Sequence, residues 1–392
     1  MKSAELFDNN NEANRVLLEI WEPSLIVLPI PERTSLANIS FRLWLKLTNQ
    51  TLKPWKINPD GIIIPELIAS DGKLLERELT TDNRKNEANR PYQGDNLVNK
   101  VVYFISNLID HFAKRGISWV STKRATSISI TANICWKKDL LQLQLLTNRY
   151  QALNSSFFDG IKPENYQLRF IYYSSSKIKP QPEKETFQTI NKKPIKGDKL
   201  TTYFVNLRLV YLTNPNDKVI EVDGIRFETI LPETVLTFPE KKGDIRIPVQ
   251  IGIRINNNTP NSLRFSFYRT LSGEIVTPNG QIVSGIYRLL GVKSPKESDF
   301  PLVLPGKNLT FFPKALFEFK GDRFTLSIAL GDGGFLSFEI FKPGIYQIRF
   351  TYNNKFEIAT IYEREIKNTR LIENIWMGRI STPFVGFCFR TF

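Results

Sequence analysis

The sequence predicts an all-β protein built from two tandem β-sandwich copies, the first of which carries an inserted amphipathic helix. Three observations support this prediction. Aromatic residues make up 12% of the 392 residues and accompany 23 Pro and 21 Gly, a composition that favours strands and turns over helix bundles. Apolar and polar residues alternate with a period of two in several segments, as they do along half-buried strands. The chain also repeats itself.

The repeat is visible in two ungapped registers. Val27-Leu28-Pro29-Ile30-Pro31-Glu32-Arg33 matches Val235-Leu236-Thr237-Phe238-Pro239-Glu240-Lys241 at an offset of 208 residues (235 − 27). Residues 162–170 match residues 342–350 at an offset of 180 (342 − 162). Matches that recur in blocks so far apart indicate a tandem duplication. We therefore expect one domain over residues 1–210 and a second over residues 218–392, separated by the turn Asn214-Pro215-Asn216-Asp217.

The same registers align strand and turn signals in both copies. Odd positions from Ile39 to Leu47 are apolar, and Val249 to Ile255 alternates in the same way. Asp71-Gly72 and Asn279-Gly280 lie between apolar runs, which is typical of hairpin turns. Gly331-Asp332-Gly333-Gly334 is also predicted to be a turn between strands, because a phosphate-binding loop would need a helix after it.

The end of each copy resembles an immunoglobulin-like sandwich. Pro343-Gly344-Ile345-Tyr346 resembles the corner in which a Tyr hydroxyl caps nearby backbone. Together with the Asn257/Thr259 turn, Asn279-Gly280 and Leu304-Pro305-Gly306, it is similar to bacterial intracellular proteinase-inhibitor-type (BsuPI-like) sandwiches. The first copy departs from this pattern, with Glu164 in place of the Gly and no Leu-Pro-Gly. The resemblance implies two tandem immunoglobulin-like β-sandwiches and says little about function.

The offset change from 208 to 180 leaves 28 extra residues in the first copy (208 − 180), and a helix is predicted among them near residues 95–116. Asp95 is a suitable N-cap and Gly116 a suitable C′ residue. The apolar positions between them form one broad stripe. This stripe either packs on the sandwich or docks on a partner or a membrane surface, with Lys114 and Arg115 in the basic flank.

Positive charge is concentrated in the first copy. The whole chain has a formal net charge of +14, of which residues 1–210 carry +9 and residues 211–392 carry +5. Much of the excess lies between the last two predicted strands of the first copy, in a segment that we call the lysine loop. Such connections often bind partners in immunoglobulin-like folds, although the lysines could also act only as a solvated loop. The candidate binding residues are Lys177, Lys179, Lys184, Lys192, Lys193, Lys196 and Lys199.

The sequence offers little for catalysis or metal binding. One His, His111, and two Cys, Cys135 and Cys388, exclude a disulfide framework, most zinc sites and His-dependent triads. Both Cys lie in strand-like segments and are expected to act as small hydrophobic residues. Carboxylates show no recurring spacing. We therefore expect no enzyme activity, no catalytic residues, no metal site and no cofactor.

The remaining prediction is a non-catalytic binding or scaffold protein that contacts an acidic protein surface through the lysine loop. The alternatives are a proteinase-inhibitor-like module, a weak binder of anionic polymers, or a membrane-surface binder acting through residues 95–116. Nucleic-acid contact is expected to be unspecific at most, because the loop contains Phe187 as its single aromatic residue and no Arg. The N-terminus lacks a signal-peptide pattern and no long apolar stretch occurs, so a cytoplasmic location is expected.

Overall fold

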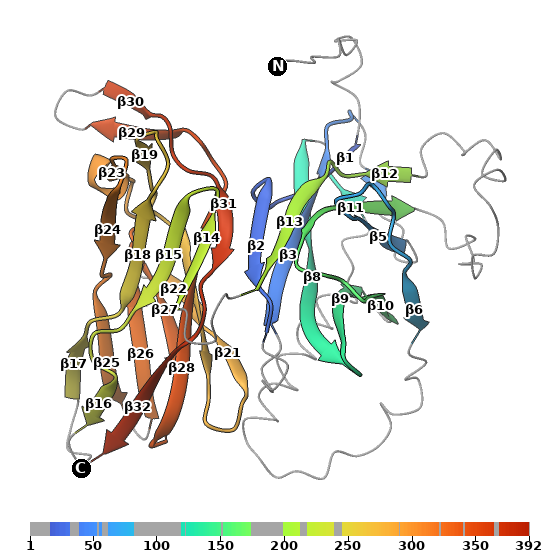
Figure 1. Ribbon diagram of the computed structural model, residues 1–392. Coiled ribbons are helices and arrows are strands. Elements are labelled where there is room, and N and C mark those ends of the chain that lie inside the picture. The colour runs from blue at the N-terminus through green and yellow to red at the C-terminus, as the bar shows by residue number, and fades with distance from the viewer. Residues whose placement is uncertain are drawn as a thin grey trace. The chain divides into compact units, whose positions relative to one another are not determined.

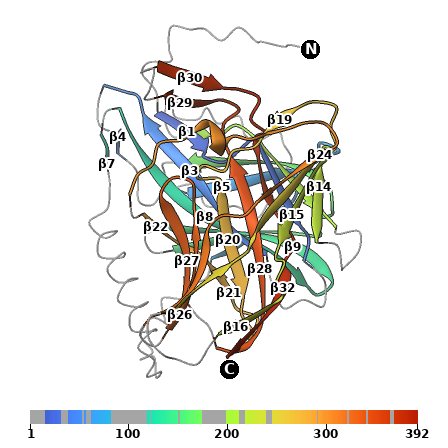
Figure 2. The ribbon, with the colours of Figure 1, turned by 90° about the vertical axis from the view of Figure 1, so that its left-hand side faces the viewer.

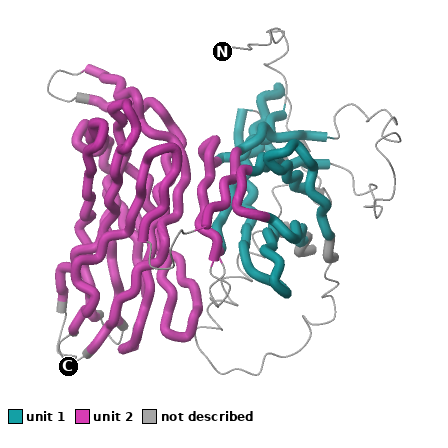
Figure 3. The backbone as a smooth tube through the Cα atoms, in the orientation of Figure 1, with its two compact units in different colours: residues 1–21, 40–161, 166–205 teal, residues 22–39, 162–165, 206–392 magenta. Residues whose placement is uncertain are grey.

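The computed structural model describes most of the chain and divides it into two compact units (Figures 1 and 3). Unit 1 comprises residues 1–21, 40–161 and 166–205, and unit 2 comprises residues 22–39, 162–165 and 206–392. Each unit is therefore assembled from segments that lie far apart in the sequence. The described residues are 16–31, 39–52, 55–56, 62–81, 119–121, 123–149, 152–173, 199–211, 218–238, 245–289, 291–320, 323–339, 342–363 and 368–391.

Unit 1 contains two principal sheets. One has the strand order β1-β3-β8-β9-β10-β6, and in the other β11 pairs with both β5 and β12. The strands are β1 (Val16–Ile20), β3 (Ile39–Asn49), β4 (Trp55–Lys56), β5 (Ile62–Ile68), β6 (Glu78–Thr81), β7 (Trp119–Val120), β8 (Arg124–Lys137), β9 (Leu140–Arg149), β10 (Ala152–Asp159), β11 (Asn165–Tyr173) and β12 (Lys199–Thr201).

Unit 2 contains three larger sheets, with the strand orders β14-β15-β18-β24, β17-β25-β26-β27-β22 and β13-β2-β31-β28-β20-β21. Strand β32 also pairs with β28, and β16 pairs with β32. The first strands are β2 (Leu25–Pro29), β13 (Val205–Val210), β14 (Val219–Val222), β15 (Ile225–Ile230), β16 (Val235–Phe238), β17 (Ile245–Val249), β18 (Gly252–Asn257), β19 (Leu263–Arg264), β20 (Leu271–Val276), β21 (Ile282–Ser284) and β22 (Ile286–Leu289). The others are β23 (Leu302–Val303), β24 (Lys307–Phe311), β25 (Ala315–Lys320), β26 (Arg323–Ala329), β27 (Gly334–Glu339), β28 (Gly344–Asn354), β29 (Ala359–Glu363), β30 (Asn368–Ile372), β31 (Gly378–Ser381) and β32 (Val385–Thr391).

The all-β prediction is confirmed for the described part of the chain. Its single helical element is a 3₁₀ turn at Glu297–Asp299. The predicted helix near residues 95–116 lies outside the described residues, and so does His111 within it.

The two sequence registers correspond to matching strand pairs and turns. Strand β5 pairs antiparallel with β11, and β20 pairs antiparallel with β28 in the equivalent register. Strand β2 runs parallel to β13 as β16 runs parallel to β32. Both predicted hairpin turns form, with Gly72 at φ +83° and Gly280 at φ +78°. Their amides donate to equivalent carbonyls, at 3.0 Å to Ala69 and 2.8 Å to Thr277.

Side-chain hydrogen bonds repeat at the same offsets. The Oδ1 atom of Asn49 accepts from the amide of Thr51 at 2.9 Å, and the Oδ1 atom of Asn257 accepts from the amide of Thr259 at 3.0 Å. Each Asn side chain also donates from Nδ2 to a Val carbonyl of a later strand. Asn49 donates to Val120 in β7, and Asn257 donates to Val303 in β23. This shared geometry supports the duplication beyond the residues that match in sequence.

One predicted strand is interrupted in the structure. The alternation of Ile39 to Leu47 gives the continuous, alternately buried β3, as expected. The segment Val249 to Ile255, predicted as one strand, is instead divided between β17 and β18, which belong to different sheets. Gly252 stands at this crossing because a Cβ there would collide with the carbonyl oxygen of Phe311. Close backbone approach at a sheet change therefore overrides the period-two pattern.

The core of unit 2 is rich in buried aromatic rings. Phe227, Phe265 and Tyr352 are fully buried and pack with Trp376 at centroid distances of 5.1–6.3 Å. The Tyr352 hydroxyl accepts from the amide of Ser266 at 2.9 Å, so its polar atom is satisfied within the core. These contacts anchor β15, β28 and the segment before β31.

Candidate functional site

The lysine loop has a described counterpart in the second copy. Six of the seven candidate lysines lie outside the described residues. The seventh, Lys199, begins β12, and its Nζ lies 5.9 Å from the ring centroid of Tyr173. At the 180-residue offset the loop corresponds to the segment that contains the hairpin β29–β30. This hairpin shows what the equivalent connection between the last two strands can build.

One face of the hairpin is packed on the body of unit 2. Ile361 and Ile372 are 3% and 2% exposed and form a small core with Phe300 and Ile375. Tyr268 packs against the same cluster. Alternation puts these residues on one face, since Ala359 pairs with Ile372 and Ile361 pairs with Arg370.

The opposite face carries exposed apolar side chains. Tyr362 and Leu371 are 55% and 56% exposed and lie on adjacent cross-strand positions of this face. Ile358 and Phe356, just before the hairpin, are 52% and 64% exposed. We call these four residues the hairpin patch. The sequence did not indicate this patch, because period-two alternation along residues 358–362 does not say which face of the hairpin is exposed.

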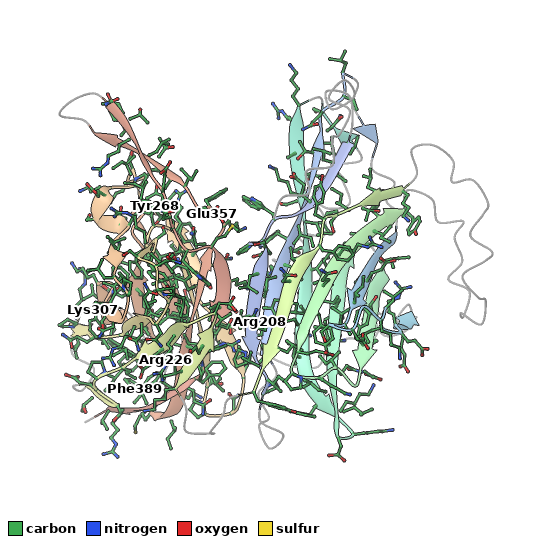
Figure 4. The ribbon with its side chains drawn as sticks, turned by 45° about the horizontal axis from the view of Figure 1, so that its top comes forward. Arg208, Arg226, Tyr268, Lys307, Glu357 and Phe389 are labelled. Carbon is green, nitrogen blue, oxygen red and sulfur yellow. The ribbon has the colours of Figure 1, made fainter. Side chains whose placement is uncertain are left out.

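The base of the hairpin is held by specific polar contacts. Asn354 donates from Nδ2 to the carbonyls of Phe356 at 2.8 Å and Trp376 at 2.7 Å. The amide of Ile375 donates to the carbonyl of Glu357 at 3.0 Å. Figure 4 labels Glu357 and Tyr268 in unit 2. The patch is therefore presented on a fixed support rather than on a free loop.

The hairpin lies at the same end of its copy as the Asn257 turn. Nδ2 of Asn257 donates to the carbonyl of Val303, in β23, which pairs with β19. In turn, Arg264 of β19 bridges to Ile375 at the hairpin base. Figures 1 and 2 both show β29, β30 and β19 at this end. The equivalent Thr48–Leu52 turn of the first copy is described, whereas every candidate lysine of the lysine loop except Lys199 lies outside the described residues.

A buried ionic group joins the segment before β2 to β28 and β31. Glu22, with a side chain 1% exposed, accepts from Arg379 at 3.1 Å and from Nδ2 of Asn353 at 3.2 Å. Burial lowers the pKa of the neighbouring Lys355, and the charge of Glu22 opposes that shift. Pairing of the buried charges makes this group a structural joint between β2, β28 and β31.

The predicted turn at residues 331–334 is confirmed and contains a buried carboxylate. Asp332 accepts from Arg269 at 2.7 Å, from the Tyr287 hydroxyl at 2.6 Å and from the amide of Gly334 at 2.9 Å. Burial raises the pKa of Asp332, but these hydrogen bonds outweigh it and hold the pKa below its usual value. Arg269 adopts φ +61° to reach the carboxylate. The contact with Gly334 closes the turn, and the contacts with Arg269 and Tyr287 tie the turn to two other segments, so we assign Asp332 a structural role.

The described residues also bear on the predictions about Cys and metals. Cys135 and Cys388 are free and half-buried in strands, and burial raises the pKa of the Cys135 thiol. No group of three or more His, Cys, Asp or Glu side chains in the described residues could hold a metal ion. The helical content of the same part of the chain includes nothing with the length and hydropathy required to cross a membrane.

Comparisons with known proteins found no relative. No family model matches the chain, and neither the curated proteins nor the solved structures contain a match.

Proposed function

We propose that the protein is a non-catalytic binding protein whose two immunoglobulin-like repeats contact a protein partner through the connection between their last two strands. The observation that carries this proposal is the hairpin patch. Tyr362 and Leu371 are more than half exposed, whereas Ile361 and Ile372 on the opposite face of the same hairpin are buried. Large apolar side chains grouped on a rigid, exposed support are typical of protein interfaces.

The immunoglobulin-like architecture is supported by the corner at Tyr346. Its hydroxyl donates to the carbonyl of Lys342 at 2.7 Å and accepts from the amide of the same residue at 3.2 Å. The parallel pairing of β16 with β32 and the antiparallel pairing of β28 with β32 fit the same plan. The resemblance to proteinase-inhibitor-type sandwiches rests on this architecture, and it therefore supports binding rather than inhibition.

The two repeats differ most at the proposed binding element. The supporting framework is shared, since Arg169 bonds Glu66 and Arg349 bonds Glu274 at equivalent positions. The connection, in contrast, is lysine-rich in the first repeat and carries an apolar patch in the second. We infer that the first repeat contacts an acidic surface and the second an apolar one.

Affinity capture from the native host with the full chain tests this function. The variant Tyr362→Ser/Leu371→Ser should lose captured proteins, identified by mass spectrometry, that Thr360→Ser/Thr369→Ser retains. This control changes polar residues on the same hairpin face. Equal capture by both variants would exclude the hairpin patch as the binding surface.

The acidic-partner part of the proposal has its own test. Replacing the seven lysines of the lysine loop by Ser should reduce capture of an acidic protein and make the remaining binding less sensitive to salt. Lys73→Ser/Lys138→Ser/Lys307→Ser changes exposed lysines elsewhere and should leave capture intact. Unchanged capture by the seven-lysine variant would remove the acidic partner.

A further inference from the structure

In the second repeat, β31 pairs with a strand from the first copy. Within the described residues, the first repeat has no equivalent pairing. Strand β2, which belongs to the first copy by sequence, adds in parallel to β31 of the second copy. Ile26 lies opposite Arg379 and Val27 lies opposite Ile380. Ile26, Val27 and Ile380 are all 0% exposed. This junction pairs β2 with the two central residues of β31, Arg379 and Ile380.

The strand equivalent to β31 in the first repeat is β12. Both pair with the strand before them, since β12 pairs with β11 as β31 pairs with β28. In the described part of the chain, β12 has β11 as its strand partner and lies at the end of its sheet. The burial of the two strands differs accordingly. Every residue of β31 is buried, whereas Lys199 and Thr201 of β12 are exposed and Leu200 is half-buried.

A complementary edge occurs on β16, the equivalent of β2. Strand β16 pairs in parallel with β32, and within the described residues this is its strand partner. Val235 is 46% exposed, although its equivalent Val27 is 0% exposed. Thr234 and Glu233, just before the strand, are exposed as well. An exposed strand edge is a ready template for another strand.

We propose that copies of this chain associate head to tail, with β16 of one copy adding in parallel to β12 of the next. We transfer the register of the β2–β31 junction to the equivalent residues of β16 and β12. In this register Thr234 lies opposite Lys199 and Val235 lies opposite Leu200. Glu233 and Lys199, which are both exposed, then supply opposite charges at this edge. Because the two edges differ, the contact is heterologous and extends into linear chains of sandwiches.

Disulfide trapping tests the contact in full-length protein with Cys135→Ala and Cys388→Ala. Leu200→Cys and Val235→Cys are placed in separate molecules, because paired positions of neighbouring strands lie within disulfide range. Oxidation of a mixture should give a disulfide dimer, and either variant alone should not. A mixture of Val235→Cys with Thr360→Cys is the matched control. No dimer from the mixture, or equal dimer from each variant alone, would overturn the proposal.

Sedimentation velocity of the unmodified chain gives an independent test. The sedimentation coefficient should rise with concentration up to about 1 mM. Leu200→Glu and Val235→Glu should each abolish the rise, since either one removes half of the contact. A monomer throughout, or association that persists in both variants, would contradict the proposal. Association that appears only after removal of residues 1–15 would also overturn the proposal, because the intact chain would then not associate.

Discussion

The repeated Asn turn yields the sharpest prediction about stability. Asn257 is fully buried and makes four hydrogen bonds. Its Nδ2 donates to the carbonyls of Asn261 at 2.7 Å and Val303 at 2.9 Å. Its Oδ1 accepts from the amide of Thr259 at 3.0 Å and from the hydroxyl of the same residue at 2.6 Å. Removal of this side chain takes away all four hydrogen bonds, including the one to the carbonyl of Val303 and the one from the amide of Thr259.

Asn257→Ala should therefore lower the free energy of unfolding by about 3–4 kcal/mol, at a net value of about 1 kcal/mol for each hydrogen bond. Asn49→Ala should cause a comparable loss, because Asn49 accepts from Thr51 and donates to Val120 in the same geometry. Urea unfolding followed by tryptophan fluorescence measures both losses. Asn257→Asp is a useful third variant, since it keeps the acceptor but sets a carboxylate against two carbonyls.

The Asp variant should be more destabilised at neutral pH than at acidic pH, where protonation restores a donor. A loss below about 0.5 kcal/mol for Asn257→Ala, which is the usual range of neutral surface changes, would refute the reasoning. A large loss for one Asn and none for the other would show that the two turns are not equivalent.

Three further predictions concern other residues. The lowered pKa of Asp332 means that its stabilising contribution is present above about pH 4 and is lost as the pH falls through the folded-state pKa; Asp332→Asn should flatten the acid side of a stability-versus-pH curve. Lys123 at φ +56° occupies the turn position of Gly306 at φ +68°, so Lys123→Gly should raise, and Gly306→Ala should lower, the melting temperature, each by an amount equivalent to about 1 kcal/mol. Tyr346→Phe should cost about 1–2 kcal/mol in urea unfolding because both hydrogen bonds to Lys342 are lost, and an unchanged midpoint would argue against the corner.

The sequence was informative wherever a local rule matched the repeat. Gly72 and Gly280 predicted hairpins because a left-handed residue at a tight turn needs no tertiary context. The first repeat lacks Leu-Pro-Gly, so its sequence showed no sign of the equivalent turn. The turn still forms there, with Lys123 in the left-handed region and the amide of Arg124 bonded to Ser121 at 3.2 Å. Tertiary contacts impose that turn on a sequence without its usual glycine.

Features that depend on distant partners were not predictable from periodicity. Strand β17 and strand β18 separate because the backbone of Gly252 meets Phe311, 59 residues later (311 − 252). The patch around Tyr362 was hidden by the same limit, since alternation does not say which face of a hairpin is covered. The clamp at Asp332 is another case, because its partners Arg269 and Tyr287 come from separate segments.

The two repeats share one plan, yet β2 pairs with the outer edge of β31, whereas within the described residues no strand pairs with the equivalent edge of β12. Amide hydrogen exchange at low protein concentration tests this difference most directly. The amides of Thr202 and Thr382, each bonded to a Phe carbonyl at 2.9 Å, are the matched internal reference. We predict similar protection for this pair, strong protection along β31, and weak protection along β12 that increases with protein concentration. Equal protection of β12 and β31 at every concentration would show that the two edges are covered alike.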